Sequence, residues 1–191
     1  MSTVTVETKT EVTRKISKVK LIKTGGVLVE FEQTINIKID QQDVEQIADV
    51  PYTGKNIPHP DLLYAFKLLR PHLAILCQQL DGRENHIRKI EEDEDFMSNF
   101  NVTGISIGGS GEHEGATIFG TKKIKRGVLN LVAPFTKFFD EIDPYENVDE
   151  FSHLVTHTLN EAELYIEGKI APNAQTAIDF DGSGDDEDLP E

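Results

Sequence analysis

The sequence predicts an α+β protein in which antiparallel sheet packs against two main amphipathic helices. Apolar residues alternate with polar ones along two separate stretches, and each stretch is followed by an apolar stripe at helical spacing. Strand-like segments therefore precede each helix, in the order β-β-β-α and then β-β-β-α again. This order favours an antiparallel sheet with helices on one face. It also suggests a structural duplication, although the two halves show no residue-by-residue repeat.

The first half of the chain begins with a predicted hairpin or three-stranded meander. Alternation places one apolar set, Val27, Val29 and Phe31, on one face of a strand, and a second set, Ile35, Ile37 and Ile39, on one face of the next strand. A strand over 18–23 precedes them, and Gly25 and Gly26 favour a tight turn because glycine tolerates positive φ. We expect a short helix over 41–48 and a loop over 51–60.

A longer helix is predicted over 60–80. It opens at Pro60 and Asp61, and its apolar stripe comprises Leu62, Phe66, Leu69, Leu73, Leu76 and Leu80. The stripe keeps its phase through Pro71, which predicts one kinked helix. Two abutting helices that separate at Arg70 and Pro71 are the alternative, since proline cannot continue the hydrogen bonds of a helix interior.

The second half repeats this pattern after a polar, charged connection over 81–97, which we expect to be mobile. Strands are predicted over 102–107, 116–122 and 127–132. A second amphipathic helix is predicted over 147–167, with one inward-facing set that comprises Val148, Phe151, Val155, Leu159, Ala162 and Ile166.

Composition narrows the class of protein. The 191 residues include 34 Asp and Glu against 19 Lys and Arg, for a formal net charge of −15, and a single cysteine, Cys77, lies in an apolar run. A disulfide-framed scaffold is excluded, and one buried thiol is typical of a reducing compartment. Neither a secretory signal pattern nor an apolar run long enough for a bilayer occurs. We therefore expect a cytoplasmic protein without membrane contact.

Charge is distributed unevenly along the chain. Residues 1–26 carry a local net charge of +4, residues 115–139 contain five cations and no acid, and residues 140–167 contain nine acids. Seven further acids lie in the last thirteen residues, among glycine and proline, a composition typical of disorder. The expected organisation is a flexible arm over 1–14, which could also be an edge strand, a compact domain over 15–170 and a disordered acidic tail over 171–191.

The cationic stretch is the strongest candidate for a binding site. Five cations, Lys122, Lys123, Lys125, Arg126 and Lys137, alternate with aromatic residues of which Phe119 is the best placed for stacking. Proteins that hold single-stranded nucleic acid combine such a cationic surface with aromatic faces for the bases. The alternative interpretation is a solvated hairpin tip above buried phenylalanines. We favour a non-enzymatic protein that contacts single-stranded nucleic acid.

Other chemistries find weaker support. His153, His157 and Glu161 line one helical stripe, as metal ligands could, but a solvated helix face has the same pattern. The loop from Gly108 to Gly115 resembles a phosphate loop only in its glycines, because a strand rather than a helix follows it. No Gly-x-Ser-x-Gly nucleophile motif occurs. An enzyme is therefore the third class, and no cofactor is expected.

The acidic end of the chain resembles the C-terminal tails of bacterial and bacteriophage single-stranded-DNA-binding proteins. The resemblance covers about fourteen residues of the tail and is one of composition. Many such tails end in an aromatic residue, whereas this chain ends Leu189-Pro190-Glu191. It implies a tail that recruits a partner protein and competes with DNA. A second hypothesis is an acidic protein-interaction module, such as an adaptor, inhibitor or assembly protein, that works through the helix face over 140–167 and the tail. Either protein could form a homo-oligomer.

Overall fold

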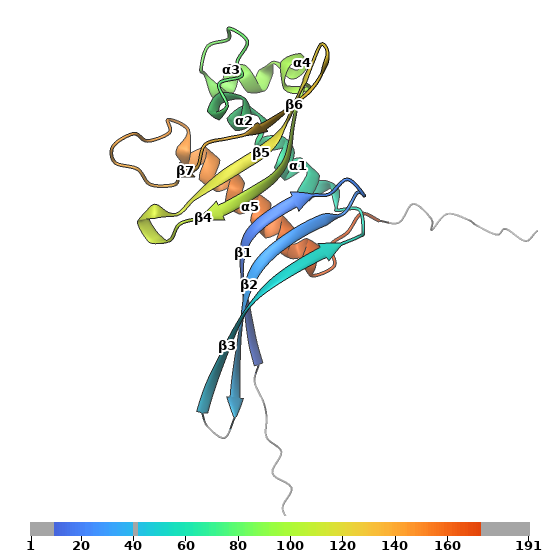
Figure 1. The fold of residues 1–191 in the computed structure, drawn as a ribbon, viewed down its shortest axis with the longest axis vertical. Coiled ribbons are helices and arrows are strands. Elements are labelled where there is room, and N and C mark those ends of the chain that lie inside the picture. Colours follow the sequence, from blue (N-terminus) through green and yellow to red (C-terminus); the bar gives the residue numbers. More distant parts are fainter. Residues whose placement is uncertain (1–9, 40–41, 173–191) are drawn as a thin grey trace, which may run out of the picture.

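A computed structural model describes residues 10–39 and 42–172, and these residues confirm the α+β class (Figure 1). One antiparallel sheet has the strand order β3-β2-β1-β4-β5-β6, with the short strand β7 also paired to β5. The strands are β1 (Thr10–Leu21), β2 (Val27–Ile39), β3 (Gln42–Gly54), β4 (Phe100–Gly108), β5 (Gly115–Ile124), β6 (Gly127–Val132) and β7 (Thr136–Lys137).

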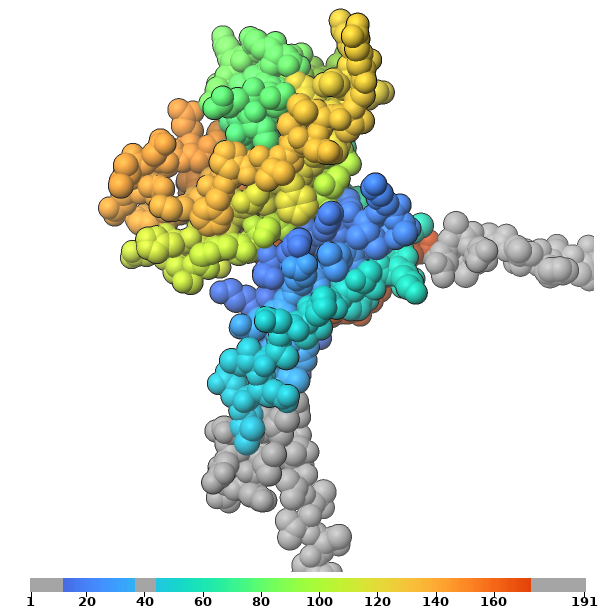
Figure 2. Space-filling view, viewed as in Figure 1, coloured from blue at the N-terminus to red at the C-terminus, as the bar shows by residue number. Residues whose placement is uncertain are grey.

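Helices cover one face of this sheet (Figure 1). They are α1 (Pro60–Leu68), α2 (Arg70–Leu76), α3 (Ile87–Glu92), α4 (Glu94–Met97) and α5 (Val148–Ile166). The core between the layers combines helix residues such as Leu73 and Phe151 with strand residues such as Val19, Ile105 and Ile118, all fully buried. Among the described residues no helix covers the opposite face, which we call the open face (Figure 2).

Two meanders form the sheet and meet along a narrow seam. Strands β1 and β4 pair at only three positions, from Lys18 opposite Ser106 to Lys20 opposite Gly104. On one side, β1, β2 and β3 precede α1 and α2, and on the other, β4, β5 and β6 precede α5. The expected β-β-β-α order therefore recurs at the level of topology.

The predicted helix over 41–48 was wrong, and so was the division of 27–39 into two strands. Strand β2 continues from Val27 to Ile39 and pairs with β3 along its whole length, from Val27 opposite Gly54 to Ile39 opposite Gln42. Strand β1 pairs in turn with β2 from Leu21 back to Thr10, so residues 10–14 belong to a strand. Pairing across a sheet overrides the weak local preference of a short segment for helix.

The apolar stripe over 60–80 forms two helices, which was the alternative interpretation. The break lies at Leu69, and Pro71 falls in the first turn of α2, where its missing N–H costs no helical hydrogen bond. The segment 81–97 contains α3 and α4, whose buried Ile87, Ile90 and Phe96 join the core. The last predicted helix is confirmed as α5.

The outer parts of β2 and β3, with the start of β1, project from the helix-covered body (Figures 1 and 2). We call this projection the acidic arm, because β3 carries Asp43, Glu45 and Asp49 and no Lys or Arg. Val44 and Ile47 are exposed along it. No helix within the described ranges has the length and apolar character needed to cross a bilayer. The predicted acidic tail lies almost entirely outside the described residues.

Candidate nucleic-acid interface

The turn between β5 and β6 presents cations to solvent. Ile124 pairs with Gly127, so Lys125 and Arg126 form a two-residue turn. Both are exposed, and so is Lys123 near the end of β5. We call residues 123–127 the basic hairpin. Its exposed cations lie within four consecutive positions with no nearby acid in the sequence, so their charges reinforce one another at the surface.

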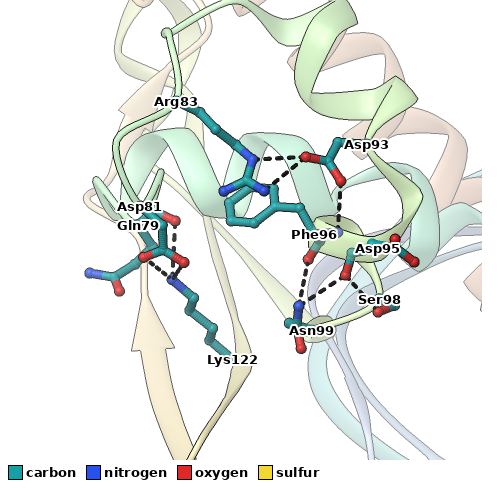
Figure 3. Close-up of polar contacts among 9 residues, drawn as sticks. All are labelled: Gln79, Asp81, Arg83, Asp93, Asp95, Phe96, Ser98, Asn99 and Lys122. Carbon is teal, nitrogen blue, oxygen red and sulfur yellow. Dashed lines mark hydrogen bonds and ion pairs between the residues drawn. The ribbon is translucent and has the colours of Figure 1, made fainter.

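Lys122 differs from its neighbour Lys123 and points to the helix side of the sheet. Its side chain is only 5% exposed, and its Nζ donates hydrogen bonds to Asp81 Oδ1 and Oδ2 at 2.7 and 2.8 Å and to the Gln79 carbonyl at 3.3 Å (Figure 3). The ammonium also lies 5.2 Å from the ring centroid of Phe100. The structure therefore places Lys122 away from the other predicted cations, with its charge already neutralised.

A second set of contacts fixes the segment that supports the basic hairpin (Figure 3). Arg83 stacks 3.9 Å above the ring of Phe96 and donates from Nε to Asp93 Oδ2 at 2.9 Å. The other oxygen of Asp93 accepts the Phe96 N–H at 3.0 Å and so caps α4. That backbone hydrogen bond, followed by the Arg83 contact, lowers the pKa of Asp93. These contacts hold residues 83–96 together, and the Lys123 N–H donates to the Asn99 carbonyl at 2.7 Å, which joins the segment to β5.

A shallow hollow of about 490 Å³ lies beside the basic hairpin, and we call it the hairpin hollow. It is lined by Ser98, Asn99, Asn101, Thr121, Lys123, Ile124, Lys125, Gly127 and Val128. Asn101 and Thr121 are cross-strand partners, as are Lys123 and Val128. Two cations, amide and hydroxyl groups, and the 63% exposed side chain of Val128 therefore meet at one place. Such a surface suits a ligand that is both anionic and partly apolar.

Phe119 lies on the open face of β5, two residues along the strand from Thr121, which lines the hairpin hollow. It is half-buried between its partners Gly104 in β4 and Val132 in β6, and Val132 is 70% exposed. The ring occupies the space above Gly104, because a Cβ at that glycine would come within 2.2 Å of Phe119 Cε2. The ring thus packs over Gly104 and stays partly exposed.

Lys137 lies away from the basic hairpin. Its strand β7 pairs with β5 at Gly115, eight residues from Lys123, which corresponds to roughly 27 Å along the strand. Its Nζ is 3.3 Å from Asp140 Oδ2. The N–H groups of Ile142 and Asp143, followed by Lys137, lower the pKa of the Asp140 carboxyl. The predicted cation set therefore divides into three environments.

Strand β1 adds two cations that sequence reasoning did not assign to this face. Lys20 and Lys18 lie opposite Gly104 and Ser106 in β4, on the same face as Phe119. Lys20 is exposed, whereas Lys18 Nζ is 2.9 Å from Glu30 Oε1. The alternation of buried Val19 with these lysines was the only sequence feature that could have indicated their face, and the pairing partner could not be read from it.

The other candidate sites do not assemble. In the part of the chain that the structure describes, no three His, Cys, Asp or Glu residues gather closely enough to hold a metal ion. Glu161 Oε2 instead accepts a hydrogen bond from Lys169 Nζ at 2.7 Å. Among the described residues, no ion pair joins Glu161 to His153 or His157. In the Gly108–Gly115 loop, the N–H groups of His113 and Glu114 bond to the carbonyls of Ser110 and Gly111. Those donors are not available as a phosphate cradle.

His72 follows Pro71 in α2 and is a buried histidine. It is fully buried, its Nδ1 lies 3.0 Å from the Tyr145 hydroxyl, and burial lowers its pKa to about 4. The ring packs between Tyr145 and Phe151. This environment holds the imidazole neutral inside the helix layer, away from the open face.

The acidic face of α5 is partly neutralised within the protein itself. Besides the pair between Glu161 and Lys169, Glu167 Oε1 lies 3.4 Å from Arg14 Nη1 of β1. The acids over 140–167 therefore present a weaker field than their number in the sequence suggests.

No protein-family model, curated protein or solved structure matches this chain.

Proposed function

We propose that this protein binds single-stranded nucleic acid on the open face of β4, β5 and β6 and catalyses no reaction. The observation that carries the proposal is the hairpin hollow, where Lys123 and Lys125 lie beside exposed apolar surface. Phe119 lies two residues along β5 from the edge of this hollow at Thr121. Phosphates need cations, and bases need flat apolar surface, so the two requirements of a single strand are met side by side.

Each group has a distinct task in this proposal. Lys123, Lys125 and Arg126 neutralise phosphates, which makes binding depend steeply on salt. Val128 and Phe119 contact base faces, while Asn101 and Thr121 offer hydrogen-bonding groups to base edges. A duplex keeps its bases stacked inside, so only the phosphate contacts would remain. Single strands should therefore bind more tightly than duplexes of the same sequence.

Charge elsewhere limits where a strand can lie. On the open face, β2 and β3 carry the cross-strand pair Glu32 and Asp49 beyond the lysines of β1, besides Glu30, which is paired with Lys18. Like charges repel phosphate, so the acidic side of the sheet confines a bound strand to the side of β4, β5 and β6. The overall charge of −15 is compatible with binding because the cations are clustered.

The test is fluorescence anisotropy at low salt, with a labelled single strand and its duplex, on the full chain. The double variant Lys123→Glu/Lys125→Glu should lose binding by at least 100-fold, since each reversal removes one phosphate contact and adds repulsion. The matched control is Lys55→Glu/Lys67→Glu, which changes the net charge equally at exposed positions outside the hollow. Equal losses in both variants, or no binding by the parent, would contradict the proposal.

A further inference from the structure

A second aromatic ring lies above glycines on the open face. Phe135 follows β6 and is 47% exposed. Its ring occupies the space over Gly108 and Gly115, because a Cβ at these glycines would lie 3.3 and 2.9 Å from ring atoms of Phe135. Gly108 and Gly115 are direct partners across β4 and β5. Phe135 therefore stands over this strand pair as Phe119 stands over Gly104.

Both rings lie on the same face. Ala116 and Ile118 of β5 are fully buried on the helix side, so alternation turns Gly115 and Phe119 toward the open face. The glycines of β4 below the two rings, Gly104 and Gly108, are four residues apart, or about 13 Å along the strand. Polar residues, Ser106 and Thr117, form the cross-strand pair between them.

Cations lie beside this path. Lys20 is opposite Gly104, at the position of the first ring, and Lys18, whose Nζ is paired with Glu30, is opposite Ser106 between the two rings. At the other end of β5 lies the hairpin hollow with Lys123 and Lys125. Aromatic and cationic groups thus follow β4 and β5 from one end to the other, as a stacking platform for an extended single strand requires.

We propose that a bound single strand runs along β4 and β5 from the hairpin hollow past Phe119 to Phe135, and that Phe135 is a second stacking residue. This inference rests on the proposed function and adds its path and length. The ligand is an unpaired strand long enough to cross the roughly 27 Å between Lys123 and Gly115. A strand that occupies the hairpin hollow and Phe119 alone gains nothing from Phe135.

Phe135 also covers two glycines, so a variant must keep that cover while it removes the aromatic face. Phe135→Leu retains apolar contact with Gly108 and Gly115 but offers no ring for a base. Phe135→Tyr keeps the ring and should behave as the parent does. Tyr64→Leu is the matched control, because Tyr64 is a comparably exposed ring on α1, which belongs to the helix layer.

The experiment measures affinity against strand length, with labelled oligothymidines of 4 to 16 nucleotides and the full-length protein. The parent and Phe135→Tyr should bind long strands more tightly than short ones by a marked step. Phe135→Leu should lose about 5- to 150-fold for long strands, the range expected for one lost base stack, and little for the shortest strands that bind. Phe119→Leu should weaken both, and Tyr64→Leu neither.

Two outcomes separate the path from the function on which it rests. An unchanged length profile in folded Phe135→Leu would overturn the path while binding itself stands, and no binding by the parent at any length would overturn both. Ultraviolet cross-linking of the parent to oligothymidine provides a readout without any variant. Cross-linked peptides should contain Phe119 and Phe135, and cross-links confined to other regions would overturn the path.

Discussion

The two meanders contain topologically equivalent hairpins of opposite charge. In each meander the second and third strands form a hairpin that extends away from the seam, β2–β3 toward one end of the molecule and β5–β6 toward the other (Figure 1). The sequence of the first hairpin, residues 27–54, contains six acids and one lysine, whereas that of the second, residues 115–132, contains four cations and no acid. One strand order therefore supports two surfaces that attract opposite partners.

Support from the helix layer also differs between these hairpins. The basic hairpin is anchored by the contact of Lys122 with Asp81 and by the segment 79–99. Val44 and Ile47 of the acidic arm instead remain exposed. A hairpin whose base is fixed on one side can present its other side to a ligand with little loss of order, and this condition is met at β5–β6.

The largest expected effect contrasts the body with the acidic arm. Leu73 is fully buried between α2 and the sheet, so Leu73→Ala should lower the free energy of unfolding by roughly 2–5 kcal/mol. Ile47 is 58% exposed, and Ile47→Ala should change it by less than about 0.5 kcal/mol. Denaturant unfolding monitored by circular dichroism measures both. A large loss for Ile47→Ala would show that the arm is covered in solution.

An intermediate effect separates the two neighbouring lysines of β5. Lys122→Met removes charged hydrogen bonds to Asp81 and should cost about 1–3 kcal/mol of stability, with the salt dependence of strand binding unchanged. Lys123→Met should leave stability unchanged and lower the log–log salt slope by about one unit. Thermal unfolding and salt titrations of anisotropy test the pair. A lower salt slope for Lys122→Met and an unchanged slope for Lys123→Met would contradict the proposal, because phosphate would then contact the helix side of the sheet.

The smallest expected effect concerns the acidic tail. Its seven acids should compete with phosphate for the basic hairpin, so truncation after Ala174 should tighten strand binding modestly at low salt. The gain should vanish at high salt, where the attraction is screened. Anisotropy on the full chain and the truncated chain measures the difference. Equal affinities at low salt would remove the competition and leave strand binding unaffected.

Local periodicity predicted most elements, and long-range pairing explains the failures. Strands β4 and β5 and helix α5 were predicted because one face of each is buried, which leaves a period in the sequence, whereas β6 buries only Leu131. Strand β3 was taken for a helix because its exposed outer part has no buried face to produce that period. Its partner β2 determines its structure, and a partner cannot be read from 41–48 alone.

The same limit applies to the candidate interface. Lys123, Lys125 and Phe119 were predicted from the clustering of cations and rings, and all three lie at or beside the hairpin hollow. Lys122 was included because adjacent cations look alike in a sequence, yet neighbours in a strand face opposite sides. Lys20 and Phe135 were not assigned because their relation to Gly104 and Gly108 depends on strand register.

The rings over glycines have an evolutionary consequence. At Gly104 the backbone carbonyl of Val19 would lie 2.7 Å from a new Cβ, so this glycine is constrained whatever stands at 119. Gly108 meets only the Phe135 ring within 4 Å, so an alanine there needs no more than a small ring movement. If selection acted on folding alone, a smaller residue at position 135 could therefore arise together with a larger one at position 108. In descendants that keep a ligand on this face, the ring at 135 should persist even where position 108 has gained a methyl group.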